Sequence, residues 1–221
     1  MSLPFKVFSC SRCEFTGLDL VISGHFNYEA PSGLFFISRR LGWCNECNGI
    51  VAVENIPNVQ KIVELKSEIE KKEQYIAHSL DRLEKSRSWF KKLLNLSVDP
   101  PSEIRSLILQ CEYDRIDMKS EENILSLLVN RKSPPRCLEC GSIDCFLLPE
   151  LPSLPEPQYP LFSSQTPQSP VEIGLKHPGC GGELLVKFSE AWISIEPKRR
   201  IYDVEGRLIR QITTHTSYHI K

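Results

Sequence analysis

Three Cys-x-x-Cys pairs and one His-x-x-Cys pair are the residues of this sequence whose types and spacing best support chemistry. A single tight turn can aim two thiolates at one ion when they are two residues apart. Two such pairs complete a tetrahedral site, which suits Zn²⁺. The sequence therefore predicts two structural Zn²⁺ ions, with the ligands Cys10, Cys13, Cys44, Cys47, Cys137, Cys140, His177 and Cys180.

The first predicted site joins the two pairs nearest the N-terminus, Cys10 with Cys13 and Cys44 with Cys47. The 30 residues between these pairs exceed the usual spacing of a zinc ribbon, but strands can bring the pairs together. A redox-active Cys-x-x-Cys usually opens a helix, whose N-terminus lowers the thiol pKa. The residues after Cys47 indicate a strand and those after Cys13 are unlike a helix start, so we expect metal binding here.

The second predicted site joins Cys137 and Cys140 to His177 and Cys180, which gives a Cys₃His ligand set. Cys145 competes with His177 for the fourth position. It lies on an expected strand, where a small apolar core residue is the simpler interpretation. Catalytic zinc keeps one position open for water, whereas both predicted sites offer four protein ligands. We therefore expect structural ions.

These knuckles and their flanking strands resemble the zinc-ribbon class, in which two hairpin knuckles hold one ion. Gly141 and Gly181 each follow the last ligand of a knuckle, where a glycine lets the turn bend. The resemblance covers both ends of the chain, leaves out residues 57–135 and identifies no particular family. It implies small metal-stabilised sheets that present a surface to protein or nucleic acid, and a shared fold does not fix which.

The rest of the sequence predicts an α+β protein in three parts. Residues 1–56 are expected to form an N-terminal zinc-ribbon module, and residues 57–135 a helical hairpin or arm. Residues 136–221 are expected to form a C-terminal zinc-ribbon module that ends in a β-meander, with Glu205-Gly206 as a hairpin turn. A Pro-rich insertion, 149–170, interrupts this module.

The predicted arm begins with a long amphipathic helix over residues 57–96, starting at Pro57. Pro100 and Pro101 end it, and Ser102 is placed to cap a second helix over 103–117, followed by a short one around 121–131. Five apolar residues repeat every seven positions along the first helix. They predict packing against a helix of the same chain or of a second copy, and they are Ile62, Ile69, Ile76, Leu83 and Phe90.

The composition is that of an ordinary globular protein, with 41% hydrophobic and 25% charged residues. The formal charge of −1 gives no general attraction to nucleic acid or to an anionic membrane. No secretory signal and no membrane-spanning stretch are expected. We therefore expect a cytoplasmic location, where thiols stay reduced, and no membrane partner.

These patterns favour a non-catalytic zinc-binding adaptor or accessory protein that docks a protein partner, with self-association through the arm as a further expectation. A nucleic-acid-binding zinc-ribbon protein is the first alternative, using a basic C-terminal face. An enzyme with a dispersed site is the second, although no nucleotide-binding or hydrolase motif is present. The candidate nucleic-acid contacts are Lys198, Arg199, Arg200, Arg207 and Arg210.

Overall fold

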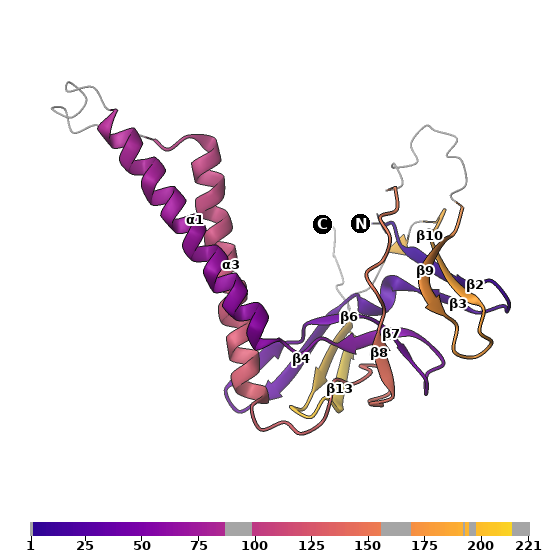
Figure 1. The fold of residues 1–221 in the computed structure, drawn as a ribbon. Helices are drawn as coiled ribbons and strands as arrows, with labels where there is room; N and C mark the ends of the chain where they lie inside the picture. The colour runs from indigo at the N-terminus through magenta and orange to yellow at the C-terminus, as the bar shows by residue number, and fades with distance from the viewer. Residues whose placement is uncertain (1, 87–98, 156–168, 192, 195–197, 214–221) are drawn as a thin grey trace, which may run out of the picture. The chain divides into compact units, whose positions relative to one another are not determined.

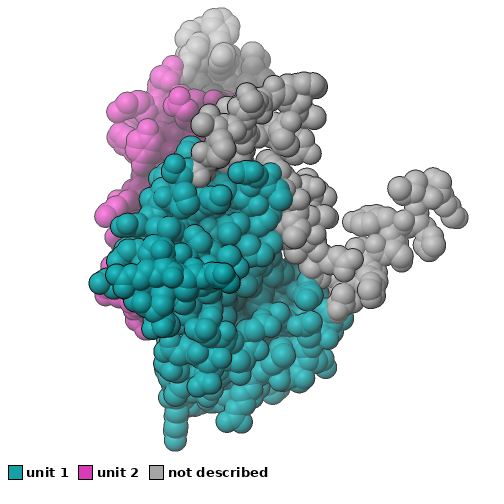
Figure 2. Space-filling view, turned by 90° about the vertical axis from the view of Figure 1, so that its right-hand side faces the viewer, with its two compact units in different colours: residues 1–56, 130–221 teal, residues 57–129 magenta. Residues whose placement is uncertain are grey.

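Strands from the two ends of the chain pair with each other in the computed structural model, which describes residues 2–86, 99–155, 169–191, 193–194 and 198–213. Residues 1–56 and 130–221 therefore form one unit, and residues 57–129 form the other (Figure 1, Figure 2). The α+β class is confirmed. The division of the two ends into separate modules is not what the structure shows, because both ends contribute strands to shared sheets.

One four-stranded sheet of the first unit has the order β3-β2-β10-β9. Antiparallel pairing of β2 with β10, from Lys6 opposite Phe188 to Cys10 opposite Leu184, joins the two halves of the chain. Burial alternates along β10, where Leu184 and Val186 face inward. The bounds are β2 Lys6–Cys10, β3 Thr16–Leu18, β9 Val171–Lys176 and β10 Glu183–Phe188.

A three-stranded sheet has the order β7-β6-β8. In it, Cys44 lies opposite Cys145, and an isolated bridge joins Val53 to Cys137. Almost every residue of β7 is buried, which fits a strand covered on both faces. The bounds are β6 Arg39–Cys44, β7 Gly49–Glu54 and β8 Cys145–Leu147.

The third sheet has the order β13-β12-β4-β5, with β12 parallel to β4. The predicted β12–β13 hairpin is present, and its turn places Gly206 at φ 78°. Strand β10, earlier in the C-terminal stretch, lies beside β2 in another sheet, so the expected run of C-terminal strands is divided between sheets. The remaining bounds are β4 His25–Ala30, β5 Gly33–Phe36, β12 Lys198–Tyr202, β13 Leu208–Thr213, β1 Ser2–Leu3, β11 Ile193–Ser194 and the 3-10 helix η1 Asp19–Ile22.

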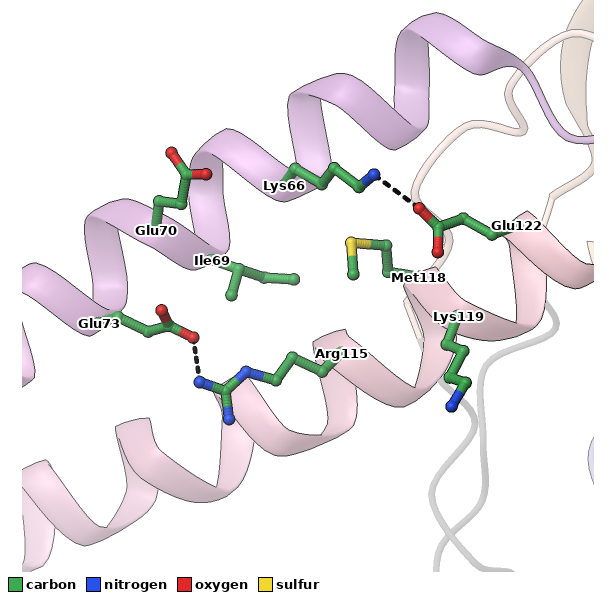
Figure 3. Close-up of a pocket in the computed structure, with 8 residues that line it drawn as sticks. All are labelled: Lys66, Ile69, Glu70, Glu73, Arg115, Met118, Lys119 and Glu122. Atoms are coloured by element: carbon green, nitrogen blue, oxygen red, sulfur yellow. Dashed lines mark hydrogen bonds and ion pairs between the residues drawn. The ribbon is translucent and has the colours of Figure 1, made fainter.

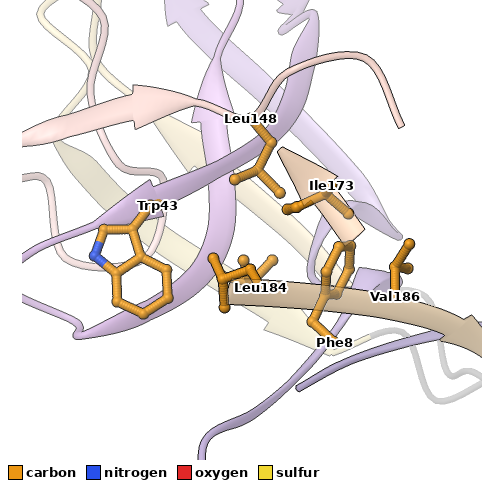
Figure 4. Packing of buried hydrophobic residues seen from close by; sticks show 7 residues of the cluster. Phe8, Trp43, Leu148, Ile173, Leu184 and Val186 are labelled. Carbon is orange, nitrogen blue, oxygen red and sulfur yellow. The ribbon is translucent and has the colours of Figure 1, made fainter. Parts of the chain in front are cut away.

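A single apolar cluster links the sheet that contains β2 and β10 to the sheet that contains β6 and β7 (Figure 4). Trp43, Phe8, Leu184 and Val186 are fully buried within it. Leu151 and Leu154, at the start of the Pro-rich insertion, pack against it. Residues 156–168 of that insertion lie outside the described residues. The cluster is formed by Phe8, Trp43, Ile50, Leu148, Ile173, Leu184 and Val186.

The second unit contains two helices, α1 (Val59–Lys85) and α3 (Ser102–Leu128). Asn58 caps α1, because its side chain accepts a hydrogen bond of 2.9 Å from the Gln60 amide. Ser102 is the first residue of α3 instead of its cap, and Pro101 precedes it without a capping side chain. A single continuous helix replaces the two helices expected over 103–131, since no proline or glycine interrupts it.

The two helices pack along an apolar seam. Ile62 and Ile69 of the predicted heptad row are buried, whereas Phe90 lies outside the described residues. Lys66 with Glu122 (2.6 Å) is one of several ion pairs that bridge α1 and α3, and Figure 3 shows it beside Ile69 and Met118, with which it lines a pocket between the helices. These pairs join the start of α1 to the end of α3, as in an antiparallel hairpin. The others are Lys61 with Glu121, Lys72 with Asp114 and Glu73 with Arg115.

Within the described part of the chain, neither helix carries an apolar stretch long enough to cross a membrane.

Candidate metal centres

All eight predicted ligands lie in two groups of four, but the pairing differs from the one expected. Each group combines one knuckle from the N-terminal segment with one from the C-terminal segment. The expected pairing followed closeness along the chain. The β2–β10 and β6–β8 pairings instead bring distant knuckles together. We call the two groups site A (Cys10, Cys13, His177, Cys180) and site B (Cys44, Cys47, Cys137, Cys140).

Site A lies at the end of the sheet that contains β2 and β10. Cys10 ends β2, and the knuckle with His177 and Cys180 connects β9 to β10. The Sγ atoms of Cys10 and Cys180 are 3.3 Å apart, and those of Cys13 and Cys180 are 3.6 Å apart. His177 presents Nδ1, which lies 3.3 Å from Cys13 Sγ and 3.2 Å from Cys180 Sγ.

Site B lies at the corresponding end of the sheet that contains β6 and β7. Cys44 ends β6 and Cys47 lies in the β6–β7 turn. The Cys44 and Cys140 Sγ atoms are 3.5 Å apart, and those of Cys47 and Cys137 are 3.8 Å apart. The amide of Leu138, between the last two ligands, donates to the Ala52 carbonyl over 2.9 Å and so attaches this knuckle to β7.

These separations match the edges of a metal-centred tetrahedron. Metal–sulfur bonds of about 2.3 Å place two tetrahedral sulfurs about 3.8 Å apart. A disulfide requires about 2.05 Å, so these cysteines are not cross-linked to one another. Each group can therefore hold one metal ion with four protein ligands.

Three knuckles turn back through a residue in the left-handed region directly after their last ligand. The glycines predicted for this role, Gly141 and Gly181, have φ values of 78° and 68°. Asn48 takes the same conformation after Cys47, with φ 48°, and asparagine tolerates it better than most residues. The equivalence of Asn48 to these glycines is visible in the sequence only once the knuckles are aligned.

Two thiols of site B are poor anions without a cation among them. Burial raises the pKa of the Cys137 thiol to about 12. Burial, and then the nearby thiols of Cys140 and Cys137, also raise the pKa of Cys47. Burial of Cys140 is outweighed by hydrogen bonds from the Ser142 amide and the neighbouring thiols, so its pKa is lowered. A bound cation removes the difficulty for the first two, because coordination deprotonates a thiol outright. The donor set is therefore suited to a cation that accepts sulfur ligands.

His177 is held by aromatic packing. Phe15 stacks on its ring at 4.9 Å between centroids, and Trp43 meets the ring nearly edge-on at 5.0 Å. The side chain is only 5% exposed. Its Nε2 is buried and makes no hydrogen bond within the described part of the structure, so the packing, and not a polar partner, orients the ring.

The second knuckle of site B is supported by neighbouring strands. Tyr202 donates a 2.6 Å hydrogen bond to the Leu138 carbonyl, and Arg200 forms a 2.6 Å ion pair with Glu139. Arg136 donates to the Gly141 carbonyl over 2.7 Å. Neighbouring strands therefore hold the two inner residues of the Cys137–Cys140 knuckle, and the hydrogen bond from Arg136 to Gly141 joins the residues that flank it.

A buried charge network adjoins this knuckle. Glu54 is fully buried, and it accepts hydrogen bonds from Tyr28 (2.9 Å), from Arg131 (2.5 and 3.0 Å) and from the Arg136 amide (2.8 Å). Burial and then the Glu54 charge raise the pKa of Tyr28, so its hydroxyl stays protonated. Because every lone pair of the carboxylate faces a donor, the network fixes structure instead of supplying a reactive group.

Cys145 and Cys111 lie outside both groups. Cys145 lies opposite Cys44 in the sheet, and its Sγ approaches the Ser142 carbonyl at 3.6 Å. His177, and not Cys145, completes a four-ligand group. Cys111 is buried on α3, where it serves as a small apolar residue of the helix seam.

The candidate nucleic-acid contacts are only partly available as a basic face. Arg200 is engaged by Glu139, and Arg210 forms a 2.6 Å ion pair with Glu29. The remaining three have exposed side chains and no ion pair with another described residue, and they are Lys198, Arg199 and Arg207.

Several residues that shape the two centres were not identified from the sequence. Phe15 and Trp43 stand close to ligands along the chain, which is a weak signal for packing on a ligand. Glu54 and Arg131 carry no local signal, because only the fold brings them together.

Comparisons of the chain with protein-family models, with curated proteins and with solved structures found no match. The class of this protein therefore rests on its own geometry, an α+β chain with two four-ligand Cys/His groups in one unit and a helical hairpin in the other.

Proposed function

We propose that the chain is a non-catalytic zinc protein whose two ions stabilise one unit and whose helical arm docks a protein partner. One observation supports the metal half of the proposal, namely that four donors converge at each site with tetrahedral separations. Sulfur-rich tetrahedral sets favour Zn²⁺. Four protein ligands leave no position for a reacting water, which favours a structural role over catalysis. Ligand thiols also need a reducing compartment, so the proposal includes a cytoplasmic location.

The metal half is tested by elemental analysis and native mass spectrometry of the protein purified under reducing conditions. We expect two zinc ions per chain, released by a strong chelator together with loss of sheet structure in circular dichroism. Cys145→Ser is the matched control, because this thiol lies beside site B without being a ligand, and it should still bind two ions. Purified protein with far less than two equivalents of zinc, or with another metal, contradicts the proposal.

The docking half rests on the outward face of α3. Leu109, Tyr113 and Ile116 follow one another at helical spacing and are 54%, 63% and 64% exposed. They lie apart from Ile104 and Cys111, which are buried toward α1. Large apolar residues in a row on a helix are typical of a surface that a partner helix or groove covers.

Site-specific photocrosslinking tests this surface in the full chain. A photoreactive phenylalanine analogue at Tyr113 should crosslink to a partner protein in the native host. The same analogue at Gln74, an exposed position on α1, should not. Adducts between two copies of the chain would identify self-association as the use of the face. Equal yields at the two positions, or no adduct at Tyr113, would contradict a docking role.

Binding of nucleic acid stays a prediction from the sequence. If the chain binds nucleic acid, its affinity for the nucleic acid should fall steeply with salt concentration, because basic side chains release counterions from the phosphates. The ion pairs of Arg200 and Arg210 reduce the charge available for such contacts, so we place this function second.

A further inference from the structure

Trp43 touches both candidate metal centres. Its ring meets the ring of His177, a ligand of site A, nearly edge-on at 5.0 Å. Its Nε1 donates a 3.1 Å hydrogen bond to Asn45 Oδ1, and Asn45 lies between Cys44 and Cys47 of site B. Trp43 also directly precedes Cys44 along β6 and is fully buried. One rigid side chain therefore connects a ligand of one centre to the knuckle of the other.

Two further contacts follow the same route. Phe15 stacks on His177 and also packs against Trp43, with 5.1 Å between ring centroids. Asn48, which follows Cys47, has its Oδ1 within 3.9 Å of the position that a Cβ on Gly179 would occupy. Gly179 lies between His177 and Cys180, so the last turn of one site B knuckle abuts a knuckle of site A.

We propose that Trp43 couples the two sites, so that binding of zinc at one site raises the zinc affinity of the other. This inference rests on the proposed function, since it requires both groups to bind zinc. Closing site B fixes the Cys44–Cys47 knuckle and, through Asn45, the indole of Trp43. A fixed indole holds the imidazole of His177 with Nδ1 toward Cys13 and Cys180. Zinc binding at site A then no longer carries the entropic cost of fixing the His177 imidazole, so the affinity of site A is higher.

The expected coupling is substantial because metal binding and local folding are the same process in small metal sites. A first ion that orders the shared cluster removes an ordering cost from the second. Couplings between sites in proteins typically change affinity by about 5- to 150-fold, and we expect roughly tenfold here. By thermodynamic necessity the factor is the same in both directions.

Native mass spectrometry during a zinc titration of the metal-free full chain tests the coupling without any mutation. At one equivalent of zinc, tenfold coupling between sites of similar affinity leaves the one-zinc form at about a quarter of the chains, and we expect this share. Independent sites, whether equal or unequal in affinity, would instead make the one-zinc form about half of the chains or more, and that result would overturn the inference. In that case two ions still bind, so the proposed zinc function stands. Failure to bind any zinc would overturn both.

His177→Cys then tests the route. This variant keeps four donors at site A, since Cys₄ and Cys₃His sets both bind zinc, but it removes the ring that Trp43 contacts. We expect two ions still to bind, with the one-zinc form now abundant. Leu151→Ala is the matched control, because it shortens a side chain packed on the same cluster and should keep the one-zinc form minor. The same scarcity of the one-zinc form in His177→Cys as in the parent would show that the Trp43–His177 contact does not carry the coupling.

Discussion

Site A and site B have similar ligands and very different surroundings. At site B, Cys44 and Cys137 are fully buried, and a charge network and two sheets support the knuckles. At site A, Cys13 and Cys180 are exposed, and only the imidazole is buried among aromatic rings. Each group of four donors can hold a metal ion, and the comparison leads us to expect that the surroundings decide how firmly the fold depends on it. We expect site B to act as the structural centre of the first unit and site A to exchange its ion faster.

The largest difference should come from removing one ligand at each site. Cys44→Ser removes a buried sulfur from site B, and we expect loss of a cooperative thermal transition for the first unit. Cys13→Ser removes an exposed ligand, and a cooperative transition at a lower temperature should remain. Differential scanning calorimetry of both variants checks this. An equal loss of the thermal transition in the two variants would contradict the expected difference between site A and site B.

The next largest loss of stability should come from disrupting the buried charge network beside site B. Glu54→Gln leaves the Arg131 guanidinium buried without its counter-charge, which typically costs about 3–5 kcal/mol. Glu29→Gln is the matched control, because its pair with Arg210 is largely exposed and should contribute less than about 1 kcal/mol. Chemical denaturation of the zinc-loaded proteins measures both. Similar losses for the two variants would show that burial of this network does not set the stability around site B.

A smaller effect is expected from alanine at one glycine of each site. A Cβ on Gly182 would lie 2.6 Å from Cys10 Sγ, so Gly182→Ala should displace a ligand and lower zinc affinity chiefly at site A. A Cβ on Gly141 would meet nothing within 4 Å, and its cost is the strain of φ 78°, about 1–2 kcal/mol. Competition with a chelating dye should therefore show weaker zinc binding for Gly182→Ala and mainly lower stability for Gly141→Ala. The reverse assignment would contradict the geometry at Cys10.

The smallest effect should follow Arg200→Gln. This change removes the ion pair with Glu139, whose side chain is 55% exposed, so we expect a loss of only about 0.5 kcal/mol. The loss should appear as faster zinc release from site B with site A unchanged, measured by stopped-flow with a chelator. Faster release from site A alone would show that Arg200 does not support the Cys137–Cys140 knuckle.

The sequence was sufficient to identify the eight donors that the structure gathers into two groups, and insufficient for their pairing. Spacing of two residues between donors is a local property, so Cys10 with Cys13 and His177 with Cys180 could each be recognised as a knuckle. Which knuckles share an ion depends on the β2–β10 and β6–β8 pairings, and nothing local specifies these.

The helices of the arm were also predicted only in part from the sequence. Heptad spacing predicted that Ile62 and Ile69 are buried, because periodicity directly encodes a helix face. The continuity of α3 through Ser120 and Glu121 was missed, although no proline or glycine interrupts the sequence there. Glu54 and Arg131 illustrate what sequence patterns cannot give, since a buried ion pair 77 residues apart has no periodic signal.

The crossed pairing of the knuckles also has a consequence for biosynthesis. Cys44 and Cys47 leave the ribosome long before Cys137 and Cys140, and at about 10 residues per second the wait is roughly ten seconds. Cys10 and Cys13 wait longer still, until Cys180 emerges. Four thiols of the nascent chain therefore lack their partners throughout translation of the arm, and neither four-ligand group can be completed before the arm has been made.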